Sequence, residues 1–291
     1  MPLVWLAILL RIVSNPIGNV FQKQLTHAGR HHPLVVNFTS LAILALISFC
    51  TIGWQVDWRH LPPHFWLWAI LTGLFGGIGN GFLVLALRDG ELSILGPINS
   101  YKSIVGLITG VFLLGELPTL AGLCGIALII GGSYFVFETT DEGFTWALLR
   151  NRSIRYRIWA LILTATEAVF IKKVVLLSDV PTSLVVWCGF GAVFAFATLI
   201  VLRIPIRRDF CSTTLPDAGR YVWLVLCLAI TALTTNYTFR YMQVGYALAL
   251  FQLSILVSIL FGYRFFQEQH IVQKLLGAVI MILGSVLILL Y

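Results

Sequence analysis

Residues 110–134 read GVFLLGELPTLAGLCGIALIIGGSY, and residues 262–286 read GYRFFQEQHIVQKLLGAVIMILGSV. Aligned without gaps, the two stretches are identical at seven of 25 positions, at a constant offset of 152 residues. Self-similarity at one fixed spacing indicates a duplicated unit. The glutamate, the glycines and the serine carry this inference, because Leu and Ile matches are common in apolar sequence. The identical pairs are Gly110 and Gly262, Glu116 and Glu268, Leu123 and Leu275, Gly125 and Gly277, Ile130 and Ile282, Gly132 and Gly284, and Ser133 and Ser285.

The composition of the 291-residue chain is typical of a membrane protein. Hydrophobic residues make up 59% of it and charged residues 11%, whereas a soluble domain has about 25% charged residues. Arginines in loops that flank the membrane explain the net charge of +7, so this charge does not indicate a nucleic-acid partner. The five cysteines lack the spacing of a metal site or a disulfide framework. We therefore expect no metal and no cofactor.

Ten segments of the chain are suited to cross a bilayer, which takes roughly 17–25 mostly apolar residues each. The sequence therefore predicts an all-α membrane protein with ten transmembrane helices. The predicted spans are 3–25, 34–53, 65–87, 93–114, 119–137, 158–177, 182–202, 221–241, 245–266 and 271–290.

The duplicated glutamate lies between the fourth and fifth spans and again between the ninth and tenth, so the repeated unit is five helices. Because five is odd, the two halves enter the membrane from opposite sides, as in the inverted repeats of many secondary transporters. We predict a first repeat over 1–140, a connecting loop over 141–157 and a second repeat over 158–291, together forming one membrane domain. The excess of arginine after odd-numbered helices places the connecting loop in the cytoplasm.

The chain resembles the drug/metabolite transporter superfamily in three features. It has two five-helix halves, a lysine late in the first helix of each half, and a glutamate before a glycine-rich last helix. The EamA-type ten-helix branch is the most similar. The most specific motif is FLLGE at 112–116 with the Gly-x6-Gly spacing that follows, matched at Glu268. The chain departs from the family pattern at two places. NPIG (15–18) stands where a Trp-Gly element is frequent, and Gln267 stands where a glycine precedes the glutamate. The resemblance implies a transporter of a small metabolite or drug-like solute, often an exporter.

Three ionisable side chains lie deep in the predicted helices: Arg11, Lys102 and Glu167. A charge at a helix centre costs about 2.5–3.5 kcal/mol on insertion scales, so such residues are candidates for function. We expect all three to face a central cavity, where the cations attract an anionic group and Glu167 takes up a proton or binds a substrate ammonium. The alternative is that Arg11 and Glu167 pair with each other and fix the first helices of the two halves together.

Polar residues near a helix break complete the predicted site. Pro97 breaks or kinks the fourth helix, and the freed carbonyl groups can line a binding site at membrane depth. The alternative is that these polar residues only join helices to one another. The predicted substrate-binding residues are Arg11, Asn15, Asn99, Tyr101, Lys102, Glu167, Asn236, Tyr237 and Gln252.

A second group of residues is assigned to structure or gating: Pro97, Glu116, Glu268, Lys23 and Lys172. Each glutamate precedes a helix, where the positive end of the helix dipole favours a carboxylate, so we prefer a helix-start role to a gating role. Both lysines come late in their helices. We favour snorkelling of the lysines to the lipid headgroups over contacts with substrate or with opposing helix ends.

A glycine stripe marks the third span, where Gly73, Gly77 and Gly81 recur every four residues. Small residues at this spacing let two helix backbones approach closely. The stripe predicts either a contact within the chain or a homodimer.

The sequence predicts a secondary transporter that works by alternating access around a site near the membrane midplane. It contains no nucleotide-binding segment, so we expect an ion gradient, exchange or the solute's own gradient to drive transport. Two cations and one carboxylate favour a solute with an anionic group, such as an amino acid or organic anion, and the resemblance implies export. Glu167 is the candidate for proton coupling. The alternatives are an exporter of cationic drugs, a passive facilitator and a membrane-embedded lipid enzyme, for which the helices hold too few acidic or histidine residues. We expect a multi-pass protein of the bacterial inner membrane, because the chain is compact.

Overall fold

The computed structural model describes residues 2–90, 95, 98–99, 101–115, 119–137, 150–207, 209, 213–267 and 271–290. Every regular element in these ranges is a helix, and no described residue belongs to a strand. The all-α class is confirmed. Pro97, Glu116 and Glu268 lie outside the described residues, so their roles stay predictions.

Helices occupy each of the predicted spans. In the first half they are α1 (Pro2–Thr26), α2 (Pro33–Ser48), α3 (Pro63–Asp89), α5 (Tyr101–Leu114) and α6 (Leu120–Phe137). In the second half they are α7 (Arg152–Leu177), α8 (Val180–Val201), α10 (Leu215–Tyr241), α11 (Val244–Phe251), α12 (Ser254–Phe266) and α13 (Ile271–Leu290). The single span predicted over 245–266 is thus divided into α11 and α12.

The first helix of the second half begins earlier than expected. α7 starts at Arg152, inside the predicted loop over 141–157. The side chain of Asn151 accepts a hydrogen bond from the backbone N–H of Ser153 at 2.9 Å. Such an N-cap satisfies one of the free amides at a helix start, so the polar sequence before 158 begins the helix rather than extending the loop.

Five helices are long and apolar enough to cross a bilayer: Leu3–Thr26, Pro33–Gly53, Pro63–Asp89, Val180–Val201 and Leu215–Tyr241. Three shorter apolar helices of 10–17 residues are Tyr101–Leu114, Ser254–Phe266 and Leu275–Gly284. The helix α7 has the length but carries several charged residues. In the described part of the chain, length and composition alone therefore support five of the ten predicted spans.

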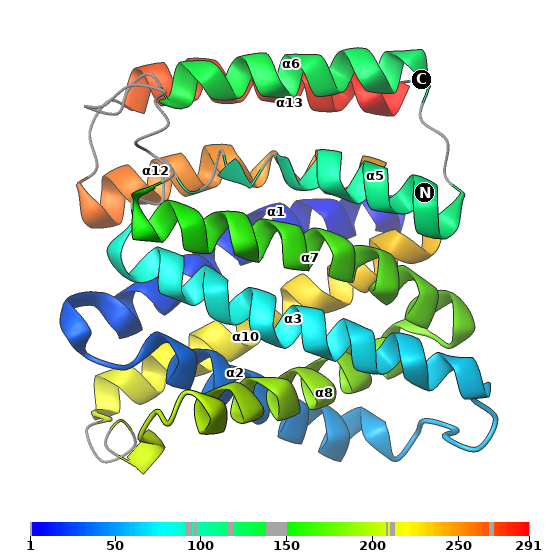
Figure 1. Cartoon of the computed structure of the whole chain (residues 1–291), viewed down its shortest axis with the longest axis vertical. Coiled ribbons are helices and arrows are strands. Elements are labelled where there is room, and N and C mark those ends of the chain that lie inside the picture. Colours follow the sequence, from blue (N-terminus) through cyan, green and yellow to red (C-terminus); the bar gives the residue numbers. More distant parts are fainter. Residues whose placement is uncertain are drawn as a thin grey trace.

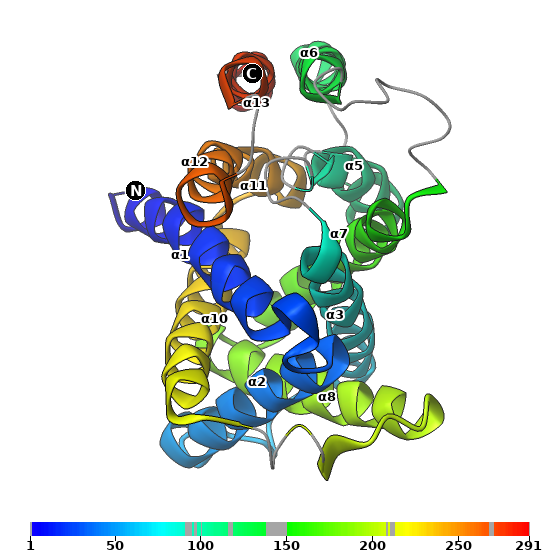
Figure 2. The same ribbon diagram turned by 90° about the vertical axis from the view of Figure 1, so that its left-hand side faces the viewer.

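The helices are stacked in layers (Figure 1). The helix α6 packs along α13 at one edge of the bundle, and α2 and α8 lie at the opposite edge. Between these edges α3 packs along α7 and α1 along α10, so the first helix of each half contacts the third helix of the other half. The helices α1 and α7 run in opposite directions across the bundle (Figure 1). Viewed from the side, α1, α3, α7 and α10 surround its centre (Figure 2).

The glycine stripe of α3 lets this helix lie directly against α8. A Cβ atom added to Gly73 would collide with Phe190, and one added to Gly77 would lie 2.7 Å from the carbonyl oxygen of Gly191. Gly81 faces α2 instead, where an added Cβ would lie 3.0 Å from a leucine side chain. The glycines therefore serve contacts within the chain, which is one of the two uses that their spacing predicts.

We expect Gly77→Ala to destabilise the folded protein by about 1–3 kcal/mol, because the added methyl group forces α3 and α8 apart. Thermal unfolding of the purified protein in detergent measures this change. Gly189→Ala on α8 is the matched control, since a Cβ atom added there meets no atom within 4 Å. A Tm for Gly77→Ala equal to that of the wild type would contradict the close packing of these two helices.

Candidate functional site

A cavity of about 120 Å³ lies at the centre of the bundle. Side chains of α1, α3, α5, α7, α8, α10 and α11 line it, together with Asn99. Its polar lining residues are Arg11, Asn15, Asn19, Asn80, Asn99, Lys102, Arg157, Thr164, Glu167, Trp187, Thr231, Thr235 and Asn236. Pockets that combine apolar walls with a few converging polar groups are typical binding sites. We take this central cavity as the candidate substrate site.

Arg11 reaches the central cavity from α1. Its Nε donates to Oγ1 of Thr235 on α10 at 3.0 Å, and its guanidinium carbon lies 4.7 Å from the ring centroid of Phe251. The residue is 8% exposed, and its Nη1 has no hydrogen-bond partner. A buried donor without an acceptor costs free energy, so an anionic ligand would stabilise this arrangement.

Glu167 enters the central cavity from α7 and is buried. Its Oε1 accepts a hydrogen bond from Nε1 of Trp187 on α8 at 2.5 Å. A Cβ atom added to Gly76 of α3 would collide with the carboxylate, so this glycine makes room for it. Among the described residues no ion pair joins Glu167 to Arg11. The direct pair between the first helices, the alternative expected from the sequence, is therefore not formed.

Lys102 stands near the start of α5, in the same cluster of charges. It lies close enough to Glu167 for their opposite charges to attract, and Arg11 and Arg157 are its like-charged neighbours. Attraction and repulsion between such groups are strong where water is scarce. Counted over the described residues, the central cavity thus holds three cations around one carboxylate.

Arg157 is a cavity residue that the sequence does not single out. Its Nε donates to the carbonyl oxygen of Leu95 at 3.0 Å, and the residue is only 7% exposed. The predicted loop ends at this residue, because the expected helix starts at 158. The missed signal is helical spacing: Arg157, Thr164 and Glu167 are seven and three residues apart and so lie on one face of α7.

The other predicted substrate-binding residues divide into two groups. Asn15, Asn99 and Asn236 line the central cavity together with Arg11, Lys102 and Glu167. Tyr101, Tyr237 and Gln252 are not among its lining residues. Gln252 instead donates from Nε2 to the carbonyl oxygen of Asn99 at 3.2 Å, and Tyr237 packs on Tyr241 with ring centroids 4.9 Å apart. The cavity residues absent from the sequence prediction are Asn19, Asn80, Arg157, Thr164, Trp187, Thr231 and Thr235.

Lys23 and Lys172 bind the end of the third helix of their own half. Nζ of Lys23 donates at 2.9 Å to the carbonyl oxygen of Gly90, the C-cap of α3. Nζ of Lys172 donates at 3.0 Å to the carbonyl oxygen of Met242, the C-cap of α10. A cation is favourable at the negative end of a helix dipole. Because Lys23 is 6% exposed, the favoured snorkelling role is wrong for this residue. Both lysines contact a helix end of their own half, whereas the alternative named opposing helix ends.

We expect Lys23→Met and Lys172→Met each to lower the free energy of unfolding by about 1.5–3 kcal/mol, because each removes a charged hydrogen bond to a helix end. Unfolding in mixed micelles with increasing SDS measures the change. Lys173→Met is the matched control, because its ammonium lies 6.0 Å from the Trp68 ring and such a contact contributes only about 0.5–1 kcal/mol. Equal losses in all three variants would argue against the capping role.

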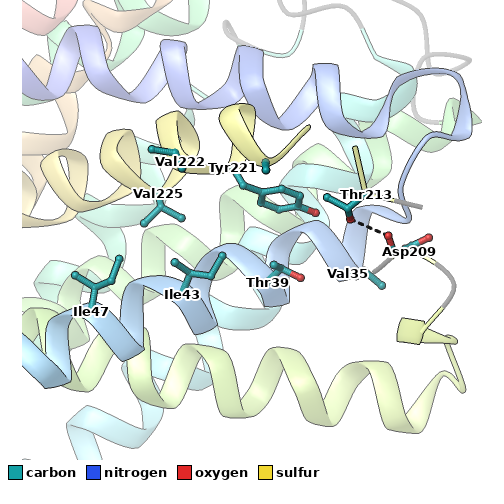
Figure 3. A pocket seen from close by; sticks show the side chains of 10 residues that line it. Val35, Thr39, Ile43, Ile47, Asp209, Thr213, Tyr221, Val222 and Val225 are labelled. Carbon is teal, nitrogen blue, oxygen red and sulfur yellow. Dashed lines mark hydrogen bonds between the residues drawn. The ribbon is translucent and has the colours of Figure 1, made fainter. Parts of the chain in front are cut away.

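A larger cavity of about 400 Å³ lies between α2 and α10. Its walls are mainly aliphatic and include Val35, Ile43, Ile47, Val222 and Val225 (Figure 3). Thr39 and Tyr221 are among its few polar residues, with Asp209 and Thr213 at one end. A cavity with so few polar groups does not suit a small polar solute, so its size alone does not make it the substrate site.

Comparison with known proteins gives matches of three kinds: a family model, a curated protein and solved structures. Residues 3–138 match the model of the EamA-like transporter family. A protein of Sinorhizobium sp described as "Uncharacterized transporter in cobO 3'region" is 29% identical over 100 residues, which cover 34% of this chain and 70% of that protein. A solved structure described as "Crystal structure of protein" has a TM-score of 0.68 at 16% identity and covers 98% of this chain and 94% of that chain. At this identity the solved structure shows a shared fold alone.

The family match agrees with the helical architecture. A transporter-family model covers α1 to α6, and five helices of the described chain have the length and composition of membrane spans. The described residues thus have the helices of a multi-pass integral membrane protein. The first half of the chain is thus similar to the EamA-like transporter family, in agreement with the FLLGE motif at 112–116.

Proposed function

We propose that the protein is a secondary active transporter that moves a small polar metabolite across the bacterial inner membrane by alternating access. We propose export of an amino acid or organic anion. The observation that carries this proposal is the central cavity, in which Arg11, Lys102, Arg157 and Glu167 are gathered inside an apolar bundle. Ionisable residues inside a membrane bundle mark solute and ion pathways.

The relation between the two halves supports alternating access. The helices α1 and α7 run in opposite directions (Figure 1), and each carries a late lysine that binds the end of the third helix of its half. These features are expected of an inverted repeat, in which the two halves move against each other around a site at the midplane.

An asymmetry between the halves supports the same mechanism. The helix α3 lies directly on α8 through Gly73 and Gly77, whereas the corresponding pair, α10 and α2, has the 400 Å³ apolar cavity between them. In an inverted-repeat transporter the two halves adopt different arrangements at any moment, and their exchange opens the site to the other side. We infer that the present arrangement is one of two access states.

Glu167 is the residue that we assign to proton coupling. It is a buried carboxylate beside the ammonium of Lys102, so a change in its protonation changes the charge of the central cavity. A substrate that carries charge into the cavity would then alter the proton affinity of Glu167, which is the requirement for coupled movement.

The alternatives are weaker on the same observations. Three cations around one carboxylate repel a cationic drug. The match of residues 3–138 to a transporter family argues against an enzyme. A passive facilitator shares the fold and the central cavity, and differs only in lacking a link between proton and solute movement.

The test of this proposal is solute uptake by proteoliposomes with and without an imposed pH gradient. We expect the gradient to drive accumulation above equilibrium in the wild type. We expect Glu167→Gln to abolish this gradient-driven component while it retains counterflow of the solute, because a glutamine exchanges no proton. Asp57→Asn is the matched control, since this acid is exposed in the connection between α2 and α3. Flux that never exceeds equilibrium in the wild type would instead indicate a passive facilitator.

A further inference from the structure

The charges in the central cavity do not balance, and this imbalance bears on the substrate class, an inference that rests on the proposed function. Arg11, Lys102 and Arg157 face a single carboxylate, Glu167. Lys102 is the cation whose charge acts on Glu167, so we assign this carboxylate to the ammonium of Lys102. The guanidiniums of Arg11 and Arg157 are then left without a carboxylate among the described lining residues.

Among the described residues, each of the two guanidiniums contacts neutral groups. Arg11 donates to the hydroxyl of Thr235 and lies over the ring of Phe251, and Arg157 donates to the carbonyl oxygen of Leu95. Neither guanidinium has a carboxylate within ion-pair distance among the described residues. Both residues are less than one-tenth exposed, at 8% and 7%. A buried charge without a counter-charge is strongly unfavourable, so these two guanidiniums favour a ligand that supplies negative charge.

The two guanidiniums belong to different parts of the central cavity. Arg11 is anchored beside α10 and α11 through Thr235 and Phe251. Arg157 also lines a small neighbouring recess, of about 10 Å³, together with Asn19 and Asn99. Because the two guanidiniums are anchored by different helices, a ligand with two anionic groups can pair with both of them.

We propose that the substrate is a small dicarboxylate of about two to four carbons, with one carboxylate bound by Arg11 and the other by Arg157. A guanidinium presents parallel N–H donors that match the two oxygens of a carboxylate. A cavity of about 150 Å³ accommodates benzene, so the 120 Å³ available here selects a ligand of similarly small size. The amides of Asn15 and Asn80 also line the cavity and supply donors for the remaining oxygens.

The experiment is a binding series on the purified full chain in detergent, by isothermal titration and thermal shift. The probes are oxalate, malonate and succinate, then succinamate, which replaces one carboxylate by an amide, then propionate, L-alanine and inorganic phosphate. We expect at least one dicarboxylate to bind at least about tenfold more tightly than succinamate, propionate, L-alanine and phosphate, because only it pairs with both guanidiniums.

The variants test which residue binds which charge. We expect Arg157→Gln to weaken dicarboxylate binding at least about tenfold. The affinity for succinamate should change little, because this half-amide already lacks one of the two ion pairs. Arg11→Gln should behave in the same way. Arg155→Gln is the matched control, since Arg155 is exposed on the same helix and its loss should leave every affinity unchanged. Arg157→Lys keeps the charge should the glutamine variant fail to fold, and it should retain a preference for dicarboxylates over succinamate.

Several outcomes overturn the dicarboxylate inference. Equal affinity for succinamate and succinate, a preference for L-alanine or propionate, or tightest binding of phosphate would each show that the two guanidiniums do not hold two carboxylates. Flux of another solute class in proteoliposomes without dicarboxylate binding would overturn the inference and leave the proposed function intact. The absence of binding and flux for every class would overturn both.

Discussion

Three cations and one carboxylate share the interior of an apolar bundle, and the cost of keeping charges there constrains the rest of the structure. Groups removed from water need a counter-charge or a dipole aimed at them. Arg11 finds the hydroxyl of Thr235, and Arg157 finds the carbonyl oxygen of Leu95. Both contacts join one half of the chain to the other. The central cavity is therefore a joint product of the two halves, and neither half alone positions its own arginine.

Small residues make this joint arrangement geometrically feasible. Gly76 leaves space for the carboxylate of Glu167, and Gly77 lets α3 meet α8. The carbonyl oxygen of Gly77 also accepts a hydrogen bond from Nδ2 of Asn37 at 2.9 Å, and Oδ1 of Asn37 accepts one from Asn80 at 3.1 Å. Since Asn80 lines the central cavity, a connected series of amides runs from α2 to the site. Hydrogen bonds between helices are favourable in a medium that offers no competing water.

The sequence predicts the helices and part of the site, because apolar length and helical spacing are local properties. It places Arg11, Lys102 and Glu167 in the central cavity correctly, since a charge inside an apolar run is itself the signal. It misses Arg157, because an arginine at the polar start of α7 looks like a loop residue until its partner 62 positions away is known. It also predicts that Lys23 reaches the lipid headgroups, whereas the ammonium donates to the carbonyl oxygen of Gly90, 67 positions away. Contacts between distant segments have no counterpart in a local pattern.

The two lysine caps have a mechanical consequence. In Figure 1, α1 and α3 end on one side of the bundle, and α7 and α10 end on the other. Lys23 therefore joins two helix ends on one side of the bundle, and Lys172 joins two helix ends on the opposite side. Each contact resists separation of the helix ends on its own side only. If the two halves move as we propose, the side that opens more easily is set by the difference in strength between these two contacts, both of which lie away from the central cavity.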